Sequence, residues 1–478
     1  MNGPITGVDV FIPMDMLIGG QDYIGQGWRM LVECLGAGRG VSLPALSTAG
    51  GEMSYLLVGA FARIRRQFGI PVGKFEGVQE ASAEIAASAY MLEAYRALVT
   101  RALEDGAPSV LTAMAKYHAT ESLRGVVNHS MDILGGRGVQ MGPRNFMALV
   151  YQTVPIAITV EGANILTRSM IIFGQGAMRC HPYLADELAA LSDESADALP
   201  RFDGLLMAHL GHTAEVFSRG ILLGLSGGLL TKPKCGNSEL SARWYRHINR
   251  YSAVFAASAD IALLTLGGDL KRRELLSARL GDVHSQLVIA CAILKFHDAQ
   301  TPDEANALHA EYALKHCFMS MNTALAAYYR NLPIKALGVT LKAAFFPWGM
   351  PQWTPSDDEV RALGELIMQP SSVRNLLADK VYLSPDPEDA QGRILYTYQL
   401  LAAVENDYEH FLSLDKQGEL AGDSVAEKLA SAVAGGQLNQ TQADAIAAYD
   451  NCRYDSLLTD AFDASLDKLD VRPLRPEA

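Results

Sequence analysis

The sequence predicts a mainly all-α protein, in which a helical bundle follows a short β segment and is followed by a second helical domain. Apolar residues recur at helical spacing through most of the chain from Trp28 onward. Residues 8–18, rich in β-branched and aromatic side chains, have strand character instead. The length of 478 residues exceeds what one hydrophobic core usually organises, so two or more domains are expected.

The elements of the first half follow from these patterns in order. Residues 1–21 have room for only a strand or two and end near Gly19-Gly20. A segment with two glycines and a proline, Phe68-Gly69-Ile70-Pro71-Val72-Gly73, ends the first helical stretch. The helices expected are a long helix or a broken pair in 28–66, amphipathic helices at about 75–103 and 108–134, and a short helix at 165–173. Residues 22–176 are therefore predicted to form an antiparallel helical bundle.

The second half begins where the composition changes at Arg179-Cys180-His181-Pro182. Residues 183–465 are rich in alanine and leucine, with helical spacing and no fixed repeat period. Residues 231–233 and 345–355 interrupt the helical pattern. The proline- and arginine-containing tail, residues 466–478, is expected to be disordered.

Charge and composition exclude several classes of protein. A formal net charge of −13 argues against a nucleic-acid partner, because phosphate backbones are held by clustered lysine and arginine. The six cysteines form no C-x-x-C pair, and the histidines are dispersed, so we expect reduced thiols and no metal site. Asp9 and Asp15 lie within the apolar N-terminal stretch, which excludes a signal peptide. We expect a cytoplasmic protein without membrane insertion, with peripheral contact at the inner membrane left open.

Three short segments carry residues suited to chemistry, and each has a structural alternative. Gly135, Gly136 and Gly138 allow backbone amides to approach a pyrophosphate, or simply form a helix C-cap and turn. Arg65 and Phe68 pair a phosphate-binding guanidinium with a ring that can cover a planar group, or else form a solvated basic helix end.

Glu161 is the third candidate. It follows the apolar residues 154–160 and precedes Gly162, so a substrate can approach a carboxylate that emerges from hydrophobic surroundings. Such a carboxylate is suited to act as a general base near neutral pH. The alternative is an acidic residue at the start of the helix at 165–173, stabilised by the positive end of the helix dipole. The glycine turn lies only a short helix upstream in the sequence, which suggests a shared site.

Together these segments resemble the C-terminal domain of acyl-CoA dehydrogenases. That family carries, in order, the patterns R-x-x-F-G-x-P, I-F-G-G-x-G and E-G-T-x-x-I-x-R. The matching segments are Arg65-Arg66-Gln67-Phe68-Gly69-Ile70-Pro71, Ile133-Leu134-Gly135-Gly136-Arg137-Gly138 and Glu161-Gly162-Ala163-Asn164-Ile165-Leu166-Thr167-Arg168. Residues 5–39 resemble the passage from the family's β-domain into its helical domain, so residues 1–21 are interpreted as a β-domain remnant. The extension after Pro182 is similar to the extra domain of bacterial long-chain fatty acyl-CoA dehydrogenases.

The resemblance implies oxidation of a fatty acyl-CoA to the trans-2-enoyl-CoA in fatty acid β-oxidation, with FAD as cofactor. It implies that Glu161 abstracts the α-proton, and that Arg39 and Gly162 meet the substrate. It further implies a homo-oligomer, and electron-transfer flavoprotein or a similar acceptor as partner. The cofactor contacts that it implies are Arg65, Phe68, Asp132, Gly135, Gly136, Ala163 and Asn164. Asp132 stands where the family usually has glutamine.

The family also has an N-terminal helical domain and a β-domain before this bundle, and we expect most of both to be missing from this chain. A non-catalytic helical oligomerisation fragment therefore remains an alternative. An acyl-CoA oxidase is a second alternative, because reactivity with oxygen depends on access to the pocket.

Overall fold

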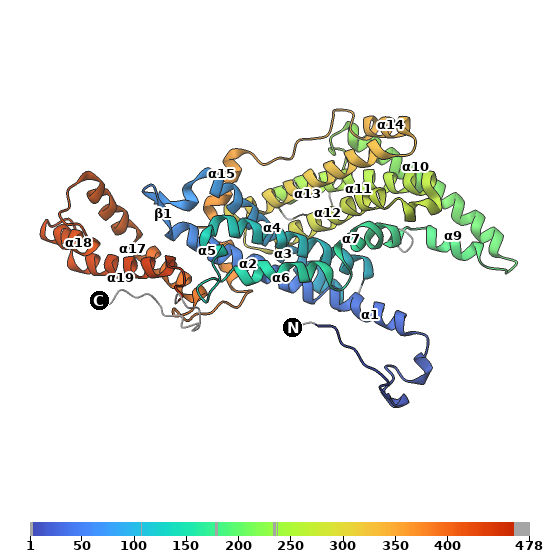
Figure 1. The fold of residues 1–478 in the computed structure, drawn as a ribbon. Coiled ribbons are helices and arrows are strands. Elements are labelled where there is room, and N and C mark those ends of the chain that lie inside the picture. Colours follow the sequence, from blue (N-terminus) through green and yellow to red (C-terminus); the bar gives the residue numbers. More distant parts are fainter. Residues whose placement is uncertain (1–2, 107, 177–179, 233–235, 237, 463–478) are drawn as a thin grey trace.

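The protein is built almost entirely from helices (Figure 1). The computed structural model describes residues 3–106, 108–176, 180–232, 236 and 238–462. The predicted tail at 466–478 lies outside the described residues. The helices of the first half are α1 (Gly27–Arg39), α2 (Ser42–Ile64), α3 (Glu76–Glu104), α4 (Ser109–Leu134), α5 (Gly136–Val139), α6 (Ala148–Thr159), α7 (Asn164–Leu166) and the π-helical η4 (Thr167–Gln175). The second half contains α9 (Leu184–Leu191), α10 (Ala198–Leu225), α11 (Glu239–Leu266), α12 (Glu274–Ala299), α13 (Glu304–Asn331), α14 (Lys335–Phe345), α15 (Asp357–Leu366), α16 (Ser372–Ala378), α17 (Ala390–Gln417), α18 (Val425–Ala434) and α19 (Gln440–Leu457).

The predicted helices are confirmed. The stretch at 28–66 is a broken pair, α1 and α2, and the helices expected at 75–103 and 108–134 are α3 and α4. The short helix expected at 165–173 continues from α7 into η4. The predicted interruption at 345–355 is also found, since α14 ends at Phe345 and α15 begins at Asp357.

The strand predicted in residues 8–18 is wrong. The segment contains one short 3-10 helix, η1 (Met14–Met16), and is followed by another, η2 (Gln21–Tyr23). Its apolar side chains are exposed, for example Val8 at 86% and Phe11 at 86%. A strand needs a neighbouring strand for its backbone hydrogen bonds, and the described residues offer none beside it. Strand composition alone therefore does not produce a strand here.

A two-stranded hairpin that the sequence did not predict projects from the end of α2. Its strands β1 (Arg66–Gln67) and β2 (Ile70–Pro71) pair antiparallel, with Gln67 opposite Ile70. Phe68 and Gly69 form the two-residue loop, and both have positive φ, 53° and 83°. Two-residue loops of this kind match the right-handed twist of the flanking strands. The loop places Phe68 at the tip of the hairpin, where it is 94% exposed.

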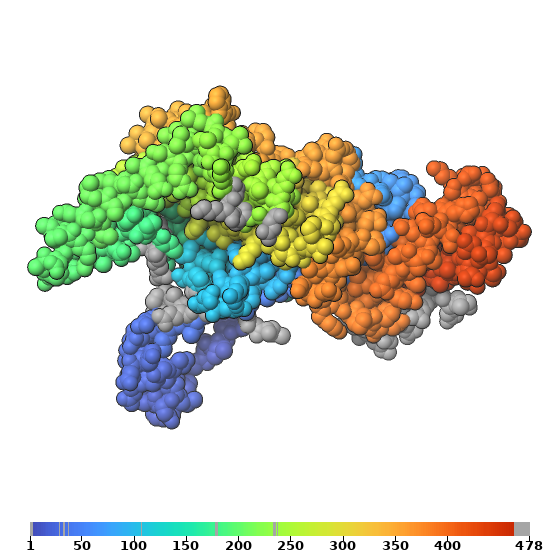
Figure 2. Space-filling view, turned by 180° about the vertical axis from the view of Figure 1, so that it is seen from behind, coloured from blue at the N-terminus to red at the C-terminus, as the bar shows by residue number. Residues whose placement is uncertain are grey.

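One hydrophobic core runs through both halves of the chain. Tyr55 and Phe61 of α2 belong to the same buried cluster as Tyr251 of α11, Phe318 of α13 and Tyr398 of α17. This core does not divide at the predicted boundary between residues 176 and 183. A separate small core lies at α17–α19, around Phe411, Ile446 and Tyr449, and these helices form a distinct end of the molecule (Figure 1). At the opposite end, α9 and the start of α10 extend away from the body as an arm (Figure 2).

The helix α11 together with η5 (Gly267–Arg272) is long and apolar enough to cross a membrane by those two measures alone. Within the fold its Tyr251, Val254 and Ala257 are fully buried in the common core. The segment therefore serves as a core helix of this fold.

Close helix contacts at glycines join the two halves. A Cβ built on Gly59 of α2 would lie 2.2 Å from the backbone oxygen of Ile367, just after α15. A Cβ on Gly364 of α15 would lie 2.4 Å from the backbone oxygen of Gln79 in α3. Any side chain at these positions forces the helices apart.

We expect Gly59→Ala to lower the free energy of unfolding by about 1–3 kcal/mol, because overpacking against backbone cannot be relieved by a rotamer change. Gly125→Ala is the matched control, since Gly125 lies within α4 and a Cβ there meets nothing within 4 Å. This control should be neutral or stabilising by up to about 1 kcal/mol. Denaturant unfolding of both variants measures the difference, and equal effects would contradict the proposed close contact.

Candidate functional site

Glu161 lies in the short loop between α6 and α7, and its backbone adopts an unusual conformation. Its φ is +53°, and only Asp9, Phe68 and Glu161 among the described non-glycine residues have positive φ. This conformation costs an L-residue about 1–2 kcal/mol, and such strain concentrates at functional sites. Gly162 follows with φ +96°, which only glycine adopts readily. The loop therefore aims the Glu161 side chain away from the path that a continuous helix would take.

The Glu161 carboxylate has one weakly engaged oxygen and one buried oxygen. Oε1 accepts a hydrogen bond of 3.4 Å from the Ser42 hydroxyl, at the first residue of α2. Oε2 is buried and has no hydrogen-bond partner among the described residues. Buried polar atoms are normally paired, so an unpaired carboxylate oxygen is a candidate for contact with a ligand. The structural alternative of a simple helix-start acid is not supported, because neither α7 nor η4 is capped by this side chain.

Arg39, at the end of α1, lies beside the same loop. Its guanidinium carbon would be 3.9 Å from a Cβ built on Gly162, and its Nε is buried without a partner among the described residues. Burial lowers the pKa of Arg39, while the charge of Glu161 opposes that shift. The structure therefore brings the two predicted substrate residues, Arg39 and Gly162, next to the predicted base.

Lys116 of α4 supports this loop through hydrogen bonds, and no sequence pattern pointed to it. Its side chain is fully buried. The ammonium donates to the backbone oxygens of Ile158 and Gly162, at 2.9 and 2.8 Å, and to Asn164 Oδ1 at 2.6 Å. Burial, with a smaller effect of Arg39, lowers the pKa of Lys116 to about 8, so the group is still mostly protonated at neutral pH. Its three hydrogens thus match three acceptors that flank Glu161 on both sides.

Asn164 is buried and its amide group is occupied by the protein. Besides accepting from Lys116, it donates from Nδ2 to Thr120 Oγ1 at 3.0 Å and to Glu121 Oε1 at 2.8 Å. Ala163, just before it, is exposed. The cofactor contacts predicted for Ala163 and Asn164 remain predictions. A cofactor contact by the Asn164 side chain would compete with its bonds to Lys116, Thr120 and Glu121.

The helix after the loop is anchored to the second half of the chain. Arg168 in η4 makes a bidentate ion pair with Asp282 of α12, with Nη2 to Oδ2 at 2.6 Å and Nε to Oδ1 at 2.9 Å. Bidentate pairs of this kind restrict geometry as well as adding energy. The extra domain therefore helps to position the segment that carries Glu161.

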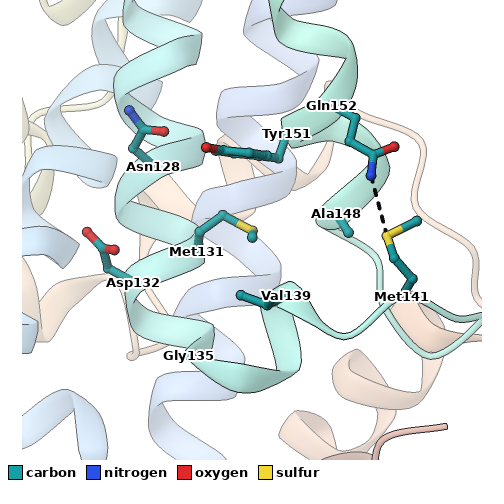
Figure 3. A pocket seen from close by; sticks show the side chains of 10 residues that line it. Asn128, Met131, Asp132, Gly135, Val139, Met141, Ala148, Tyr151 and Gln152 are labelled. Carbon is teal, nitrogen blue, oxygen red and sulfur yellow. Dashed lines mark hydrogen bonds between the residues drawn. The ribbon is translucent and has the colours of Figure 1, made fainter.

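The predicted glycine turn lines an open cavity of about 800 Å³ (Figure 3). Gly135 has φ +59° and ends α4, and Gly136 begins α5. A Cβ at either glycine would meet nothing within 4 Å, so a ligand can approach both positions, although the Gly135 amide itself donates to the Met131 backbone oxygen at 2.9 Å. Asp132 lies one turn earlier on α4 and also lines the cavity, opposite Tyr151 and Gln152 of α6. The structure brings together three of the predicted cofactor residues.

Arg65 and Phe68 lie at the end of α2 and at the tip of the hairpin. The Arg65 guanidinium carbon is 5.8 Å from the centre of the Phe61 ring, and Phe68 packs edge-on against Phe75 at 6.2 Å. Arg63, one turn of helix earlier than Arg66, does not add to a solvated basic helix end, because it is 5% exposed and pairs with Glu405 of α17 at 2.7 Å. An aromatic ring 94% exposed at a hairpin tip has the exposure that contact with another molecule requires.

Glu161 and the glycine turn lie apart within this chain. They lie at opposite ends of α6, whose 12 residues correspond to about 18 Å at 1.5 Å per residue. A site shared by both motifs stays a prediction, since it would have to span this helix, which contains Pro155. The chain presents two distinct surfaces, one with Glu161, Arg39 and Gly162 and another with Asp132, Gly135 and Gly136.

Asn145, which was not predicted as a site residue, closes the loop after the glycine turn. Its Nδ2 donates to the backbone oxygens of Arg137, Gly138 and Gln140 at 2.8–2.9 Å. Its Oδ1 accepts from the backbone amides of Met147 and Ala148 at the start of α6. Asparagine before an apolar run is a known helix-start signal and could have been noticed. Lys116 and Asp282 had no such signal, because each contacts a segment distant in sequence.

Histidines and acids also gather away from both surfaces. The ligand atoms of His181, His209 and Asp260 lie within 4.8 Å of one another. His181 Nε2 is 3.1 Å from Asp260, and His209 Nδ1 is 2.8 Å from Glu187. His181 Nδ1 accepts from the backbone amides of Tyr183 and Leu184. A neutral histidine that binds a metal through Nε2 carries its proton on Nδ1, whereas His181 Nδ1 accepts hydrogen bonds here. The contacts are therefore hydrogen bonds that hold α9 and α10 against α11.

Comparisons with known proteins agree with this architecture. Residues 25–174 match the family model described as acyl-CoA dehydrogenase, C-terminal domain. Residues 178–462 match the model described as acyl-CoA dehydrogenase, C-terminal, bacterial type. Among solved structures, the fold is similar to an acyl-CoA dehydrogenase complexed with FAD from Bacillus anthracis, with a TM-score of 0.55 and 16% identity, covering 75% of this chain and 58% of that chain.

Two curated relatives match shorter stretches. A short/branched chain specific acyl-CoA dehydrogenase from Bos taurus mitochondria is 33% identical over 140 residues, which are 28% of this chain and 31% of the relative. A protein named HemX from Proteus mirabilis is 57% identical over 60 residues, 13% of this chain and 35% of that protein. The chain thus spans about a third of the length of these relatives. Since the bacterial-type model alone matches more than half of its residues, the chain belongs to the acyl-CoA dehydrogenase family.

Proposed function

We propose that this chain carries the catalytic base and part of the cofactor site of an FAD-dependent enzyme that oxidises fatty acyl-CoA to trans-2-enoyl-CoA. The observation that carries the proposal is Glu161, held on strained backbone with a buried oxygen that has no partner among the described residues. A structural carboxylate would be paired, whereas a general base must keep an oxygen available for the proton that it removes.

The residues around Glu161 have separate tasks in this proposal. Glu161 takes the α-proton of the thioester, and Gly162 leaves room for the substrate to approach. Lys116 keeps the loop in one conformation through the backbone of Ile158 and Gly162. Arg39 supplies positive charge beside the carboxylate and the substrate. FAD, when bound, supplies the acceptor for the β-hydride.

The residues present fit such a cofactor. The uncovered positions of Gly135 and Gly136 give a pyrophosphate room to approach the start of α5, where backbone amides bind phosphate readily. Phe68 and Arg65 suit a planar ring and a phosphate, and Ala163 and Asn164 complete the proposed cofactor contacts. The proposal includes a homo-oligomer, which rests on the resemblance to a family in which these contacts reach the FAD of a neighbouring subunit. The FAD named for the Bacillus anthracis structure supports the identity of the cofactor.

We propose electron-transfer flavoprotein or a similar acceptor as the partner, and the cytoplasm as the setting. Leucines and a methionine exposed along the arm offer a surface for peripheral contact with the inner membrane. They are Leu188, Leu191, Leu199, Leu206, Met207 and Leu210.

Flavin binding by the purified full chain tests the proposal. We expect FAD to bind, with visible flavin absorbance and quenched flavin fluorescence, either to the chain alone or after the remaining domains of the fold are supplied as a separate polypeptide. A chain that stays colourless under both conditions contradicts the proposal and supports the non-catalytic oligomerisation fragment. Release of hydrogen peroxide during turnover would identify an acyl-CoA oxidase instead.

A further inference from the structure

The loop that follows the glycine turn is held by residues some 320 positions later in the chain. Arg137, inside the turn, is 6% exposed and is not one of the residues that line the open cavity. Its guanidinium donates to the backbone oxygen of Ser456, near the end of α19. Gln140 Nε2 donates to the backbone oxygen of Asp460 at 3.0 Å. The turn and the extra C-terminal domain are therefore in direct contact.

Arg144 and two aspartates make the strongest part of this contact. The Arg144 backbone amide donates to Asp460 Oδ2 at 2.9 Å. Its guanidinium donates to the Asp455 backbone oxygen at 2.7 Å and to Asp455 Oδ1 at 3.0 Å. The Asp455 carboxylate also pairs with Arg393 of α17. One carboxylate thus joins the loop to two helices of the C-terminal domain.

Asp460 is packed against the loop as well as bonded to it. It is 6% exposed, and a Cβ built on Gly142 would lie 2.2 Å from its Oδ2. Burial lowers the pKa of Arg137 to about 10, an effect that Arg144 strengthens and Asp460 opposes. Removing a buried carboxylate from among these guanidinium groups leaves positive charge uncompensated, which is strongly destabilising in the immediate surroundings.

We propose that the segment from Asp455 to Asp460 is a clamp that sets the conformation of the turn at Gly135 and Gly136, so that the extra C-terminal domain determines how tightly the cofactor is held there. The proposal rests on the proposed function in so far as that turn binds the cofactor. The clamp itself is a property of the chain without any ligand. These residues act as positioning residues, since their contacts are with Arg144 and Gly142 in the loop that follows the turn.

The test compares Asp460→Ala and Asp455→Asn with the wild-type full chain. Asp444→Ala is the matched control, because Asp444 lies on the same helix α19 and bonds only locally, to Gln440. Hydrogen–deuterium exchange of the ligand-free protein is measured for peptides covering residues 135–147. We expect exchange there to become at least about 10-fold faster in both clamp variants, with peptides of α3 and the control unchanged.

The second measurement is the FAD dissociation constant, by equilibrium dialysis. We expect both clamp variants to bind at least about 10-fold more weakly, which corresponds to about 1.4 kcal/mol. Asp455→Asn keeps the shape of the side chain and serves if Asp460→Ala fails to fold. Unchanged exchange at 135–147 overturns the clamp. Faster exchange with unchanged affinity overturns its role in holding the cofactor. If the wild type binds no FAD, the proposed function fails separately, and the exchange result alone decides the clamp.

Discussion

Replacing Glu161 with glutamine is expected to lower kcat by about 10²- to 10⁴-fold, the range that a positioned general base contributes. Glutamine has the same size but cannot accept the α-proton at neutral pH. The buried Oε2 lacks a partner among the described residues, and Glu161 is the charged group that acts on Arg39 beside Gly162. Dehydrogenase activity with a fatty acyl-CoA and an artificial electron acceptor measures the change.

A second measurement isolates proton abstraction from the hydride step. In D₂O, a working base exchanges the α-proton of a bound acyl-CoA for deuterium. Glu161→Gln should abolish this exchange while leaving the affinity for flavin within about twofold. Glu104→Gln is the control, since it makes the same change at an exposed carboxylate that pairs only with Arg101 on its own helix. Full exchange in Glu161→Gln would show that another group is the base.

Lys116→Met is expected to lower both stability and kcat. Methionine fills a similar volume but leaves the backbone oxygen of Ile158 and the Asn164 Oδ1 without their donor, while the Gly162 oxygen keeps only the Thr167 hydroxyl. Buried acceptors left unpaired cost about 1–3 kcal/mol each, so the free energy of unfolding should fall by at least about 2 kcal/mol. Because the loop then no longer holds Glu161 in one orientation, kcat should fall at least about 10-fold, with KM changed less.

The pH profile distinguishes positioning from a purely structural role. The pKa of Lys116 is lowered to about 8, and Arg39, Glu121 and Glu161 are the charged groups that influence it. Raising the pH through 8 removes one of three donated hydrogens, so wild-type kcat should fall above that pH. The decrease of kcat at high pH should be absent in Lys116→Met. Lys116→Arg, which keeps the charge, should recover part of the activity. Lys295→Met, at an exposed residue of α12, should change neither measurement.

Local patterns predicted much of the fold. The helices α3 and α4 were expected at 75–103 and 108–134 and are found at Glu76–Glu104 and Ser109–Leu134, because apolar spacing reports which face a helix buries. The strand expected in residues 8–18 failed for a related reason. A helix satisfies its own backbone hydrogen bonds, whereas a strand depends on a partner that composition cannot supply.

The candidate site was predicted only in part. Glu161, Gly162, Gly135 and Gly136 could be identified because each motif is a run of neighbouring residues whose order is informative by itself. The unusual φ of Glu161 and the exposure of Phe68 could not be, since they depend on how helix ends and the hairpin turn meet the rest of the fold. The short helix between the two motifs was expected and is α6, but its direction, which places the motifs at its two ends, depends on how it packs in the fold.

By itself, the sequence determined the helical class of this protein, its family resemblance and the segments that carry the candidate base and cofactor residues. Periodicity and motif order are sufficient for these, since both are properties of neighbouring residues. Only the tertiary structure decided what holds those segments in place: Lys116 against the Glu161 loop, Asp282 on Arg168, and Asp455 with Asp460 on Arg144 in the loop after the glycine turn. Each of these contacts joins residues from 46 to more than 300 positions apart, and such contacts arise from helix packing, which no local pattern encodes.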